Sequence, residues 1–325
     1  VDSLYELDRI GEVARAVDAV APVAPRIDVH VPTLTHPGLE TAHGGKAGID
    51  RDDAAEAFRR AAAHPGLDPV GLHLHIGSQI TSVEPYREAI AAALDLVAEV
   101  EGAAGVRLRF VNAGGGFAVP YREAPVTCHP SDYFCSLLTA ADYAEVVAGA
   151  VAARRPDLAL FLEPGRSIAA TTAVLVARVE NEKTKGRRDG MGRRIGDERW
   201  VTVDAGFNTL LEHTNYAWYY RTVVASRAGE QADAEFRLAG PLCDGGDVFA
   251  GDADSPYRRF PAATGVGDVI AFLDAGAYTL EMMSPYNARP TAAAFAVTAA
   301  GRLVPIRRRD TAGDLAAHDV VPAGD

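Results

Sequence analysis

The sequence holds few cysteines and no long apolar run. Its three cysteines, Cys128, Cys135 and Cys243, include no CxxC pair, so no disulfide framework is expected, and the pattern is typical of a reducing, cytoplasmic compartment. No apolar stretch reaches the roughly 18 residues that a membrane helix needs, and the first residues lack a charged-then-apolar signal pattern. A membrane partner is therefore not expected.

Positive charge is also scarce. The 325 residues include 32 Lys and Arg against 44 Asp and Glu, a net charge of −12. Binding to a phosphate backbone needs clustered Lys and Arg, so a nucleic-acid partner is not expected. One basic run, Lys183 to Arg194, is interrupted by Gly and Asp. It favours a solvated hairpin loop over a binding patch.

Strand-like and helix-like segments alternate in the first half of the chain. Ser3 and Glu6 form a capping box that predicts a helix start almost at the first residue. Strands are expected at 27–31, 70–76, 106–111 and 158–162, and helices at 52–63, 84–100 and 141–154. This alternation predicts a parallel sheet with crossover helices over residues 1–170.

Short strand candidates dominate the second half, and turn-rich segments separate them. They lie at 173–178, 200–203, 217–226, 235–238, 268–273 and 295–299. A mostly antiparallel β domain is therefore expected over residues 171–325. The parallel half supplies about four strands where a closed (β/α)₈ barrel needs eight. The predicted fold class is α/β plus β, a partial barrel followed by a β domain.

Three glycine-bearing loops follow predicted strands, at the edge where α/β folds bind ligands. The first loop carries His73 and His75 on one strand face, and with no third ligand nearby these histidines predict no metal site. In the second, 112–116, three consecutive glycines let backbone N–H groups converge on an anion. The third, 163–166, places a carboxylate and a guanidinium three residues apart. Each loop alone also fits an ordinary turn.

Two further segments carry polar groups in the second half. The segment 240–247 places the Cys243 thiol beside two acids, although an inert buried cysteine is the commoner state of this residue. The segment Gly276–Tyr278 is followed by Tyr286 and Asn287. The order HxHxGSQ, GGG, EPGR, CDGxD, GAY and YN closely resembles the fold-type III pyridoxal-phosphate (PLP) decarboxylases. That family includes the ornithine, diaminopimelate and arginine decarboxylases, and the resemblance runs from Val1 to about Arg309.

The resemblance implies PLP as cofactor and a role for each motif. His75 would stack on the pyridine ring, and Glu163 would pair with the ring nitrogen and keep the ring an effective electron sink. Cys243 would return a proton after CO₂ leaves, and Asp244 would contact the distal amine of the substrate. The groups around the phosphate would be Ser78, Gly114, Gly115, Gly116, Gly165, Arg166 and Tyr286. In relatives the Cys-bearing loop enters the neighbouring subunit's site, so a homodimer is implied.

The family's Schiff-base lysine has no counterpart here. It lies on the first barrel strand, in a segment resembling Tyr-x-Val-Lys-Ala-Asn, whereas the only lysines are Lys46, Lys183 and Lys185. Lys46 matches a Lys-Phe-Gly-type segment near the middle of the barrel. We expect roughly three βα units before Val1, and without them this chain alone would be inactive. The alternative is a natural short chain that binds PLP poorly or not at all.

The substrate-binding segment departs from the diaminopimelate decarboxylases. Their arginine for the distal carboxylate aligns with Glu212, while Tyr216 is retained. A glutamate repels a carboxylate and attracts an ammonium group, so the sequence favours decarboxylation of a basic amino acid such as ornithine, lysine or arginine. Diaminopimelate decarboxylation, as in lysine biosynthesis, is the alternative.

Two other classes of protein share this barrel. A non-catalytic relative that regulates an active partner would explain the missing lysine, but retention of Glu163, Arg166, Cys243 and Tyr286 argues against it. Alanine-racemase-like chemistry is disfavoured by the Cys243 loop and by the Glu-Pro-Gly-Arg segment.

Overall fold

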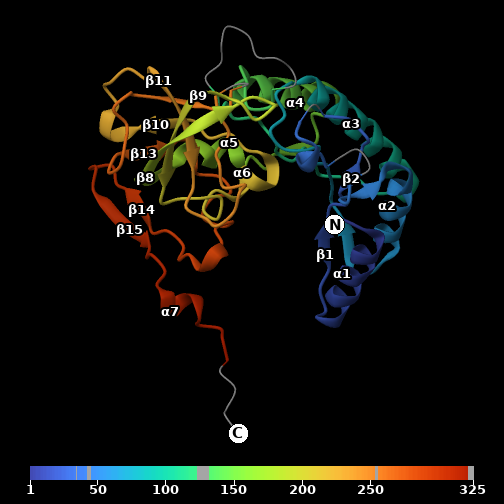
Figure 1. Ribbon diagram of the computed structural model, residues 1–325. Helices are drawn as coiled ribbons and strands as arrows, with labels where there is room; N and C mark the ends of the chain where they lie inside the picture. The colour runs from blue at the N-terminus through green and yellow to red at the C-terminus, as the bar shows by residue number, and fades with distance from the viewer. Residues whose placement is uncertain (34, 42–44, 123–131, 253–254, 321–325) are drawn as a thin grey trace. The chain divides into compact units, whose positions relative to one another are not determined.

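The computed structural model describes residues 1–33, 35–41, 45–122, 132–252 and 255–320. The chain divides into two compact units, Val1–Ala169 and Ala170–Asp325. Figure 1 shows the helices and strands of each unit.

Four helices of the first unit lie side by side (Figure 1). They are α1 (Leu4–Ala16), α2 (Ala54–Ala63), α3 (Glu84–Ala104) and α4 (Ala140–Arg154), and a short α5 (Arg166–Ala169) ends the unit. The predicted start of α1 is confirmed, because Ser3 is its N-cap and its Oγ accepts from the Glu6 N–H at 3.1 Å. The Glu6 carboxylate caps the N–H of Asp2.

In the described part of the first unit, the strand pairs are all parallel. β1 (Ala21–Val23) pairs with β4 (Leu67–Pro69), and β2 (Ile27–Asp28) pairs with β3 (Ile49–Asp50). A three-stranded sheet follows, in the order β5 (Gly71–His73), β6 (Phe110–Asn112), β7 (Ala159–Phe161). The predicted parallel pairing with crossover helices is confirmed. The strands β1, β3 and β4 were not predicted.

The core of the first unit forms where helices cover these strands. Phe58 on α2, Val97 on α3, and Leu72 and Val111 on the sheet are all 0% exposed. Each such side chain contributes roughly 1.5–3 kcal/mol relative to an exposed position. The short turns η1 (Pro37–Leu39) and η2 (Arg51–Asp53) lie in the connections before α2.

The second unit is built on a six-stranded sheet. Its order is β10 (Thr222–Val224), β13 (Val269–Phe272), β8 (Leu175–Arg188), β9 (Arg194–Val203), β11 (Ala234–Ala239), β12 (Arg258–Phe260). Every neighbouring pair is antiparallel except β9 and β11. A separate hairpin joins β14 (Ala294–Val297) to β15 (Leu303–Arg307). The predicted, mostly antiparallel β structure is thus confirmed.

Short helical segments connect these strands. They are η3 (Ala170–Thr172), α6 (Leu211–Tyr216), η4 (Ala225–Arg227), η5 (Tyr286–Ala288) and α7 (Ala312–Leu315). The strand predicted at 217–226 is confirmed only at β10. The helix α6 was not predicted.

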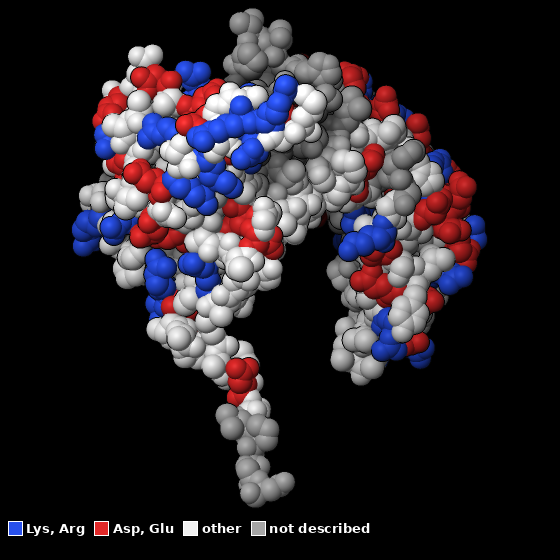
Figure 2. Space-filling model, in the orientation of Figure 1, with Lys and Arg blue, Asp and Glu red and all other residues white. Residues whose placement is uncertain are grey.

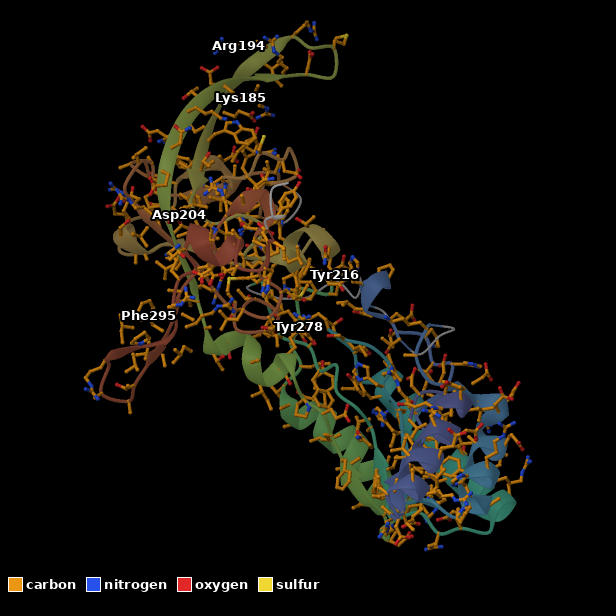
Figure 3. All side chains as sticks on the ribbon, turned by 90° about the horizontal axis from the view of Figure 1, so that it is seen from below. Lys185, Arg194, Asp204, Tyr216, Tyr278 and Phe295 are labelled. Atoms are coloured by element: carbon orange, nitrogen blue, oxygen red, sulfur yellow. The ribbon has the colours of Figure 1, made fainter. Side chains whose placement is uncertain are left out.

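The basic run Lys183–Arg194 lies on the exposed β8–β9 hairpin, which agrees with the predicted solvated hairpin, although most of its residues belong to paired strands and not to a loop. Most of it belongs to the β8–β9 hairpin, with Arg194 near the turn (Figure 3). Lys183 faces Trp200 across the two strands, and its Nζ lies 5.7 Å from that ring's centroid. Figure 2 shows the Lys and Arg side chains gathered over this hairpin. The cation–π contacts and strand pairing explain why these residues are ordered.

The expectation that the cysteines form no disulfide is wrong. Cys135 is disulfide-bonded, whereas Cys243 is free and exposed. Within the described ranges, no helix is long and apolar enough to cross a membrane.

Candidate active site

The three predicted loops of the first unit come together at the carboxyl edge of the β5–β6–β7 sheet. The Gly115 N–H donates to His75 Nδ1 at 3.2 Å, and the Glu163 N–H donates to the Gly114 carbonyl at 2.7 Å. A Cβ atom on Gly115 would lie 2.1 Å from the Glu163 carbonyl oxygen. Glycine is therefore required here by the close approach of two loops.

The glycine triplet has fewer free donors than its sequence suggests. The Gly114 N–H donates to Asn112 Oδ1 at 2.9 Å, and the Gly115 N–H is committed to His75. The three N–H groups therefore cannot all donate to one anion in this arrangement. Among the hydrogen bonds of the described residues, only the Gly116 N–H of the triplet has no acceptor within the chain.

The two histidines of the first loop lie near the same carboxylate. Burial is the main cause that lowers the pKa of His75 to about 4, helped by Arg26. Because Nδ1 of His75 accepts a backbone N–H, the ring is held neutral in one tautomer. Burial also lowers the pKa of His73, whose Nε2 is buried without a hydrogen bond and lies 3.7 Å from Glu163 Oε2.

Glu163 is held by one oxygen and remains open at the other. Asn112 Nδ2 donates to its Oε1 at 2.7 Å, from the end of the adjacent strand. The Glu163 side chain is 54% exposed. The carboxylate is thus fixed at the sheet edge and accessible to a cationic partner.

Arg166 lies beside the first loop. Its guanidinium is buried and donates to Tyr121 Oη at 3.0 Å, and its Nε lies 3.4 Å from Ser78 Oγ. Gly165 precedes α5, and a Cβ there would meet nothing within 4 Å. The structure therefore brings Ser78 and Arg166 together, with a hydroxyl and a cation on the same side of these loops.

Two supporting residues were not predicted. Gln79 is 0% exposed, and its side-chain amide bonds the backbone of Val119 in both directions and the carbonyl of Tyr133. Tyr86 on α3 donates to the Gly115 carbonyl at 2.8 Å. The signal for Gln79 was its place directly after Ser78 in the motif. Tyr86 had no local signal, because its partner is 29 residues away.

The predicted groups of the second unit form a second cluster. The Cys243 N–H donates to Asn287 Oδ1 at 2.6 Å, and the Tyr286 hydroxyl donates to Asp244 Oδ2 at 3.1 Å. This bond to Asp244 is the main cause that raises the pKa of Tyr286. Cys243, Asp244 and Tyr286 are all exposed. Tyr286 thus contacts Asp244. The sequence analysis expected these two residues at different groups, Tyr286 at the cofactor phosphate and Asp244 at the distal amine of the substrate.

Glu212 lies on α6 and faces the interior of the second unit. Its side chain is 1% exposed, and Oε2 accepts from the Tyr220 hydroxyl at 3.3 Å. The predicted contact of Glu212 with the distal end of the substrate stays a prediction, and in this unit its carboxylate is buried against Tyr220. Tyr216, at the end of α6, is half-buried.

Two family models match the chain. Residues 1–170 match the pyridoxal-dependent decarboxylase pyridoxal-binding domain, and residues 124–276 match the C-terminal sheet domain of the pyridoxal-dependent decarboxylases. The first match alone covers more than half of the sequence and includes His75, Glu163 and Arg166.

Individual relatives agree with these models. A diaminopimelate decarboxylase from Archaeoglobus fulgidus is 36% identical over 325 residues, which cover 99% of this chain and 71% of the relative. The diaminopimelate decarboxylase from Helicobacter pylori, solved in complex with L-lysine, superimposes with a TM-score of 0.80 at 31% identity, over 98% of this chain and 71% of that one. A lysine decarboxylase from Selenomonas ruminantium superimposes with a TM-score of 0.67 at 26% identity, over 86% of this chain and 64% of that one. The chain therefore belongs to the fold-type III PLP-dependent decarboxylases and is a PLP-dependent carboxy-lyase of amino-acid metabolism.

Proposed function

We propose that the protein is a diaminopimelate decarboxylase. The observation that carries the proposal is the similarity to diaminopimelate decarboxylases over nearly the whole chain, 36% identity in the Archaeoglobus fulgidus enzyme. The solved relatives with L-lysine support it, because lysine is what remains when diaminopimelate loses one carboxyl group as CO₂. This favours the alternative from the sequence over the basic amino acid first expected.

The residues at the sheet edge of the first unit fit PLP. The neutral imidazole of His75 provides a flat face for the ring, and the accessible carboxylate of Glu163 can pair with the ring nitrogen. The buried, unpaired Nε2 of His73 lies beside that carboxylate. We propose that Ser78 and Arg166, with Gly116 and Gly165, hold the phosphate. When bound there, PLP would supply an electron sink for the pair left on the α-carbon as CO₂ departs.

The exposed cluster of the second unit would supply the proton. We propose that Cys243 donates it to the α-carbon after CO₂ has left, since its thiol is free and accessible. Asp244, held by Tyr286, would bind the distal amine, and Tyr286 would also reach the phosphate. In the proposed homodimer, the Cys243 loop of one subunit completes the site of its partner. The first unit is proposed to be part of a (β/α)₈ barrel.

A comparison of individual substrates tests this function. The PLP-loaded native protein would be supplied separately with meso-diaminopimelate, L-lysine, L-ornithine and L-arginine, and CO₂ release measured. We expect kcat/KM for diaminopimelate to exceed that for each other amino acid by about a hundredfold, because a site that pairs both ends of its substrate rejects molecules lacking one group. A larger kcat/KM for lysine or ornithine would assign the protein to the basic amino-acid decarboxylases, the second candidate.

A variant of Cys243 distinguishes an effect on the reaction step from an effect on substrate binding. Cys243→Ala removes the proposed proton donor without adding bulk. We expect kcat for diaminopimelate to fall about a hundredfold, the usual size of a general-acid contribution, with KM little changed. An unchanged kcat would remove Cys243 from the reaction.

A further inference from the structure

The loop that carries Cys243 is closed at its base by backbone bonds. Ala239 and Val248 form an antiparallel bridge, and the Gly240 N–H donates to the Asp247 carbonyl at 2.9 Å. Between these points the thiol-bearing turn is exposed. Such a turn needs additional contacts to hold one conformation, since exposed loops with few buried contacts open readily.

Asp247 supplies contacts on the buried side of the loop. Its side chain is 2% exposed, Oδ2 accepts from the Leu242 N–H at 2.8 Å, and Oδ1 accepts from the Phe207 N–H at 2.9 Å. The carboxylate fills the space in front of two glycines, because a Cβ on Gly206 or Gly240 would lie 2.6 or 2.2 Å from Oδ2. A carboxylate shared between two backbone donors thus joins the Cys243 loop to the segment before α6.

Asn287 supplies a contact on the exposed side. Its Oδ1 accepts the N–H of Cys243 itself at 2.6 Å. Asn287 has φ 58° and ψ 30°, a left-handed conformation that Asn tolerates better than most residues. The neighbouring Arg289 donates to the Pro241 carbonyl at 3.1 Å, two residues before Cys243. The segment 286–289 therefore grips the loop at two points.

The two segments that contact the Cys243 loop, 206–208 and 284–289, also contact each other. The rings of Phe207 and Tyr286 lie 5.4 Å apart, and the Ser284 N–H donates to the Asn208 carbonyl at 2.9 Å. Three segments far apart in sequence, 206–208, 240–247 and 284–289, thus hold one another within the second unit. This mutual support makes the position of Cys243 depend on Asp247 and Asn287.

We propose that Asp247 and Asn287 are positioning residues that fix the Cys243 loop for proton return. The inference rests on the proposed role of Cys243. Neither side chain needs to touch substrate or cofactor, because both act through the backbone of the loop.

Amide hydrogen exchange of the full chain without PLP provides the direct test. Asn287→Gly removes the acceptor and suits the left-handed backbone, whereas Asn287→Asp keeps an oxygen at the same place. We expect the Cys243 amide to exchange about fivefold to tenfold faster in Asn287→Gly, and near the wild-type rate in Asn287→Asp. Asp247→Asn should accelerate at least one of the Leu242 and Phe207 amides similarly, because its amide oxygen can replace one of the two acceptors but its amide nitrogen cannot accept an N–H bond.

A matched control is Asp233→Asn. Asp233 Oδ1 accepts the Ala262 N–H at 3.0 Å in the same unit, away from the loop, so this variant should leave the exchange of Cys243 and Leu242 unchanged. Steady-state kinetics of the PLP-loaded native protein follow, with the amino acid that it decarboxylates. We expect kcat to fall at least tenfold in Asn287→Gly with KM within twofold, and Asn287→Asp to restore kcat.

Each arm has a result that overturns the inference. Asp247 and Asn287, with their hydrogen bonds to the backbone, are called the clamp of the Cys243 loop. Unchanged exchange of the Cys243 amide in Asn287→Gly would show that the clamp does not hold the loop. Faster exchange with unchanged kcat would show that holding the loop has no role in the reaction. The proposed function is tested separately: it is wrong if the wild-type protein does not release CO₂ from diaminopimelate. In that case the exchange measurement still decides whether the clamp exists.

Discussion

Asn112 Nδ2 donates a hydrogen bond of 2.7 Å to Glu163 Oε1, across the ends of the adjacent parallel strands β6 and β7. The same Asn112 accepts the Gly114 N–H through its Oδ1. One side chain therefore orients both the glycine loop and the carboxylate proposed to pair with the cofactor. The second oxygen of Glu163 stays accessible, 3.7 Å from His73 Nε2.

The charge of Glu163 can be removed without changing its shape. In Glu163→Gln, the side-chain oxygen can still accept from Asn112, but the pairing with a pyridinium nitrogen is lost. A hydrogen bond to a charged group contributes about 1.5–3 kcal/mol, so we expect PLP to bind about tenfold to a hundredfold more weakly. Absorbance titration of the native protein with PLP measures this change.

The control for this variant is Glu84→Gln. Glu84 pairs with Arg87 on the exposed face of α3, where an ion pair contributes little. Its PLP affinity should equal that of the wild type. Equal affinity in Glu163→Gln as well would contradict the proposed role of Glu163.

Gly115 should be intolerant of even one added methyl group. In Gly115→Ala, the new Cβ would lie 2.1 Å from the Glu163 carbonyl oxygen, so loops must shift, at a cost of about 1–3 kcal/mol in the free energy of unfolding. Gly102→Ala on α3 meets nothing within 4 Å and should stabilise by up to about 1 kcal/mol. Urea denaturation distinguishes the two. Equal stability of both variants would show that the loop contact is soft.

Local sequence patterns predicted the helices α1 to α4 and the strands β5 to β7. The capping residues of α1 act within one turn of helix, so they can be seen in a short window. The motif loops were also placed correctly, because glycines and charged residues directly follow strands β5, β6 and β7.

Contacts between distant segments could not be predicted in this way. The burial of Glu212 depends on Tyr220 and on the packing of α6, and neither alignment nor charge reveals it. The extent of the strands in the basic hairpin was not predicted, because Lys183 and Lys185 pack on the ring of Trp200 from the adjacent strand. The clamp around Cys243 joins positions 44 residues apart. Such pairings follow from tertiary structure.

The lowered pKa of His75 predicts a pH-dependent stability. In the unfolded chain this histidine titrates near 6.5, whereas burial holds its folded pKa at about 4. Between these values the unfolded chain binds a proton that the native one does not. The free energy of unfolding should therefore fall as pH decreases from about 6.5 to 4, by roughly 3 kcal/mol for this group.

Urea denaturation at pH 7 and pH 5 measures this effect. His75→Gln cannot titrate, so the difference in the free energy of unfolding between the two pH values should shrink. His318→Gln is the control, because His318 is exposed and its loss should leave the pH dependence unchanged. An undiminished difference in His75→Gln would assign the effect to other groups, such as His73 and His213, whose pKa values burial also lowers.

Glu212 provides the final prediction, which separates a structural role from substrate selection. Its buried carboxylate accepts from Tyr220, so Glu212→Gln should keep an acceptor. If the role of this group is structural, the ratio of kcat/KM for diaminopimelate and lysine should stay within about twofold of the wild-type ratio, since a side chain that does not contact the substrate cannot discriminate between substrates. Glu212→Leu removes the acceptor and should lower the free energy of unfolding by about 1–3 kcal/mol. A shift of the substrate ratio towards diaminopimelate in Glu212→Gln, without loss of stability, would instead mean that this carboxylate faces the distal end of the substrate and selects its charge.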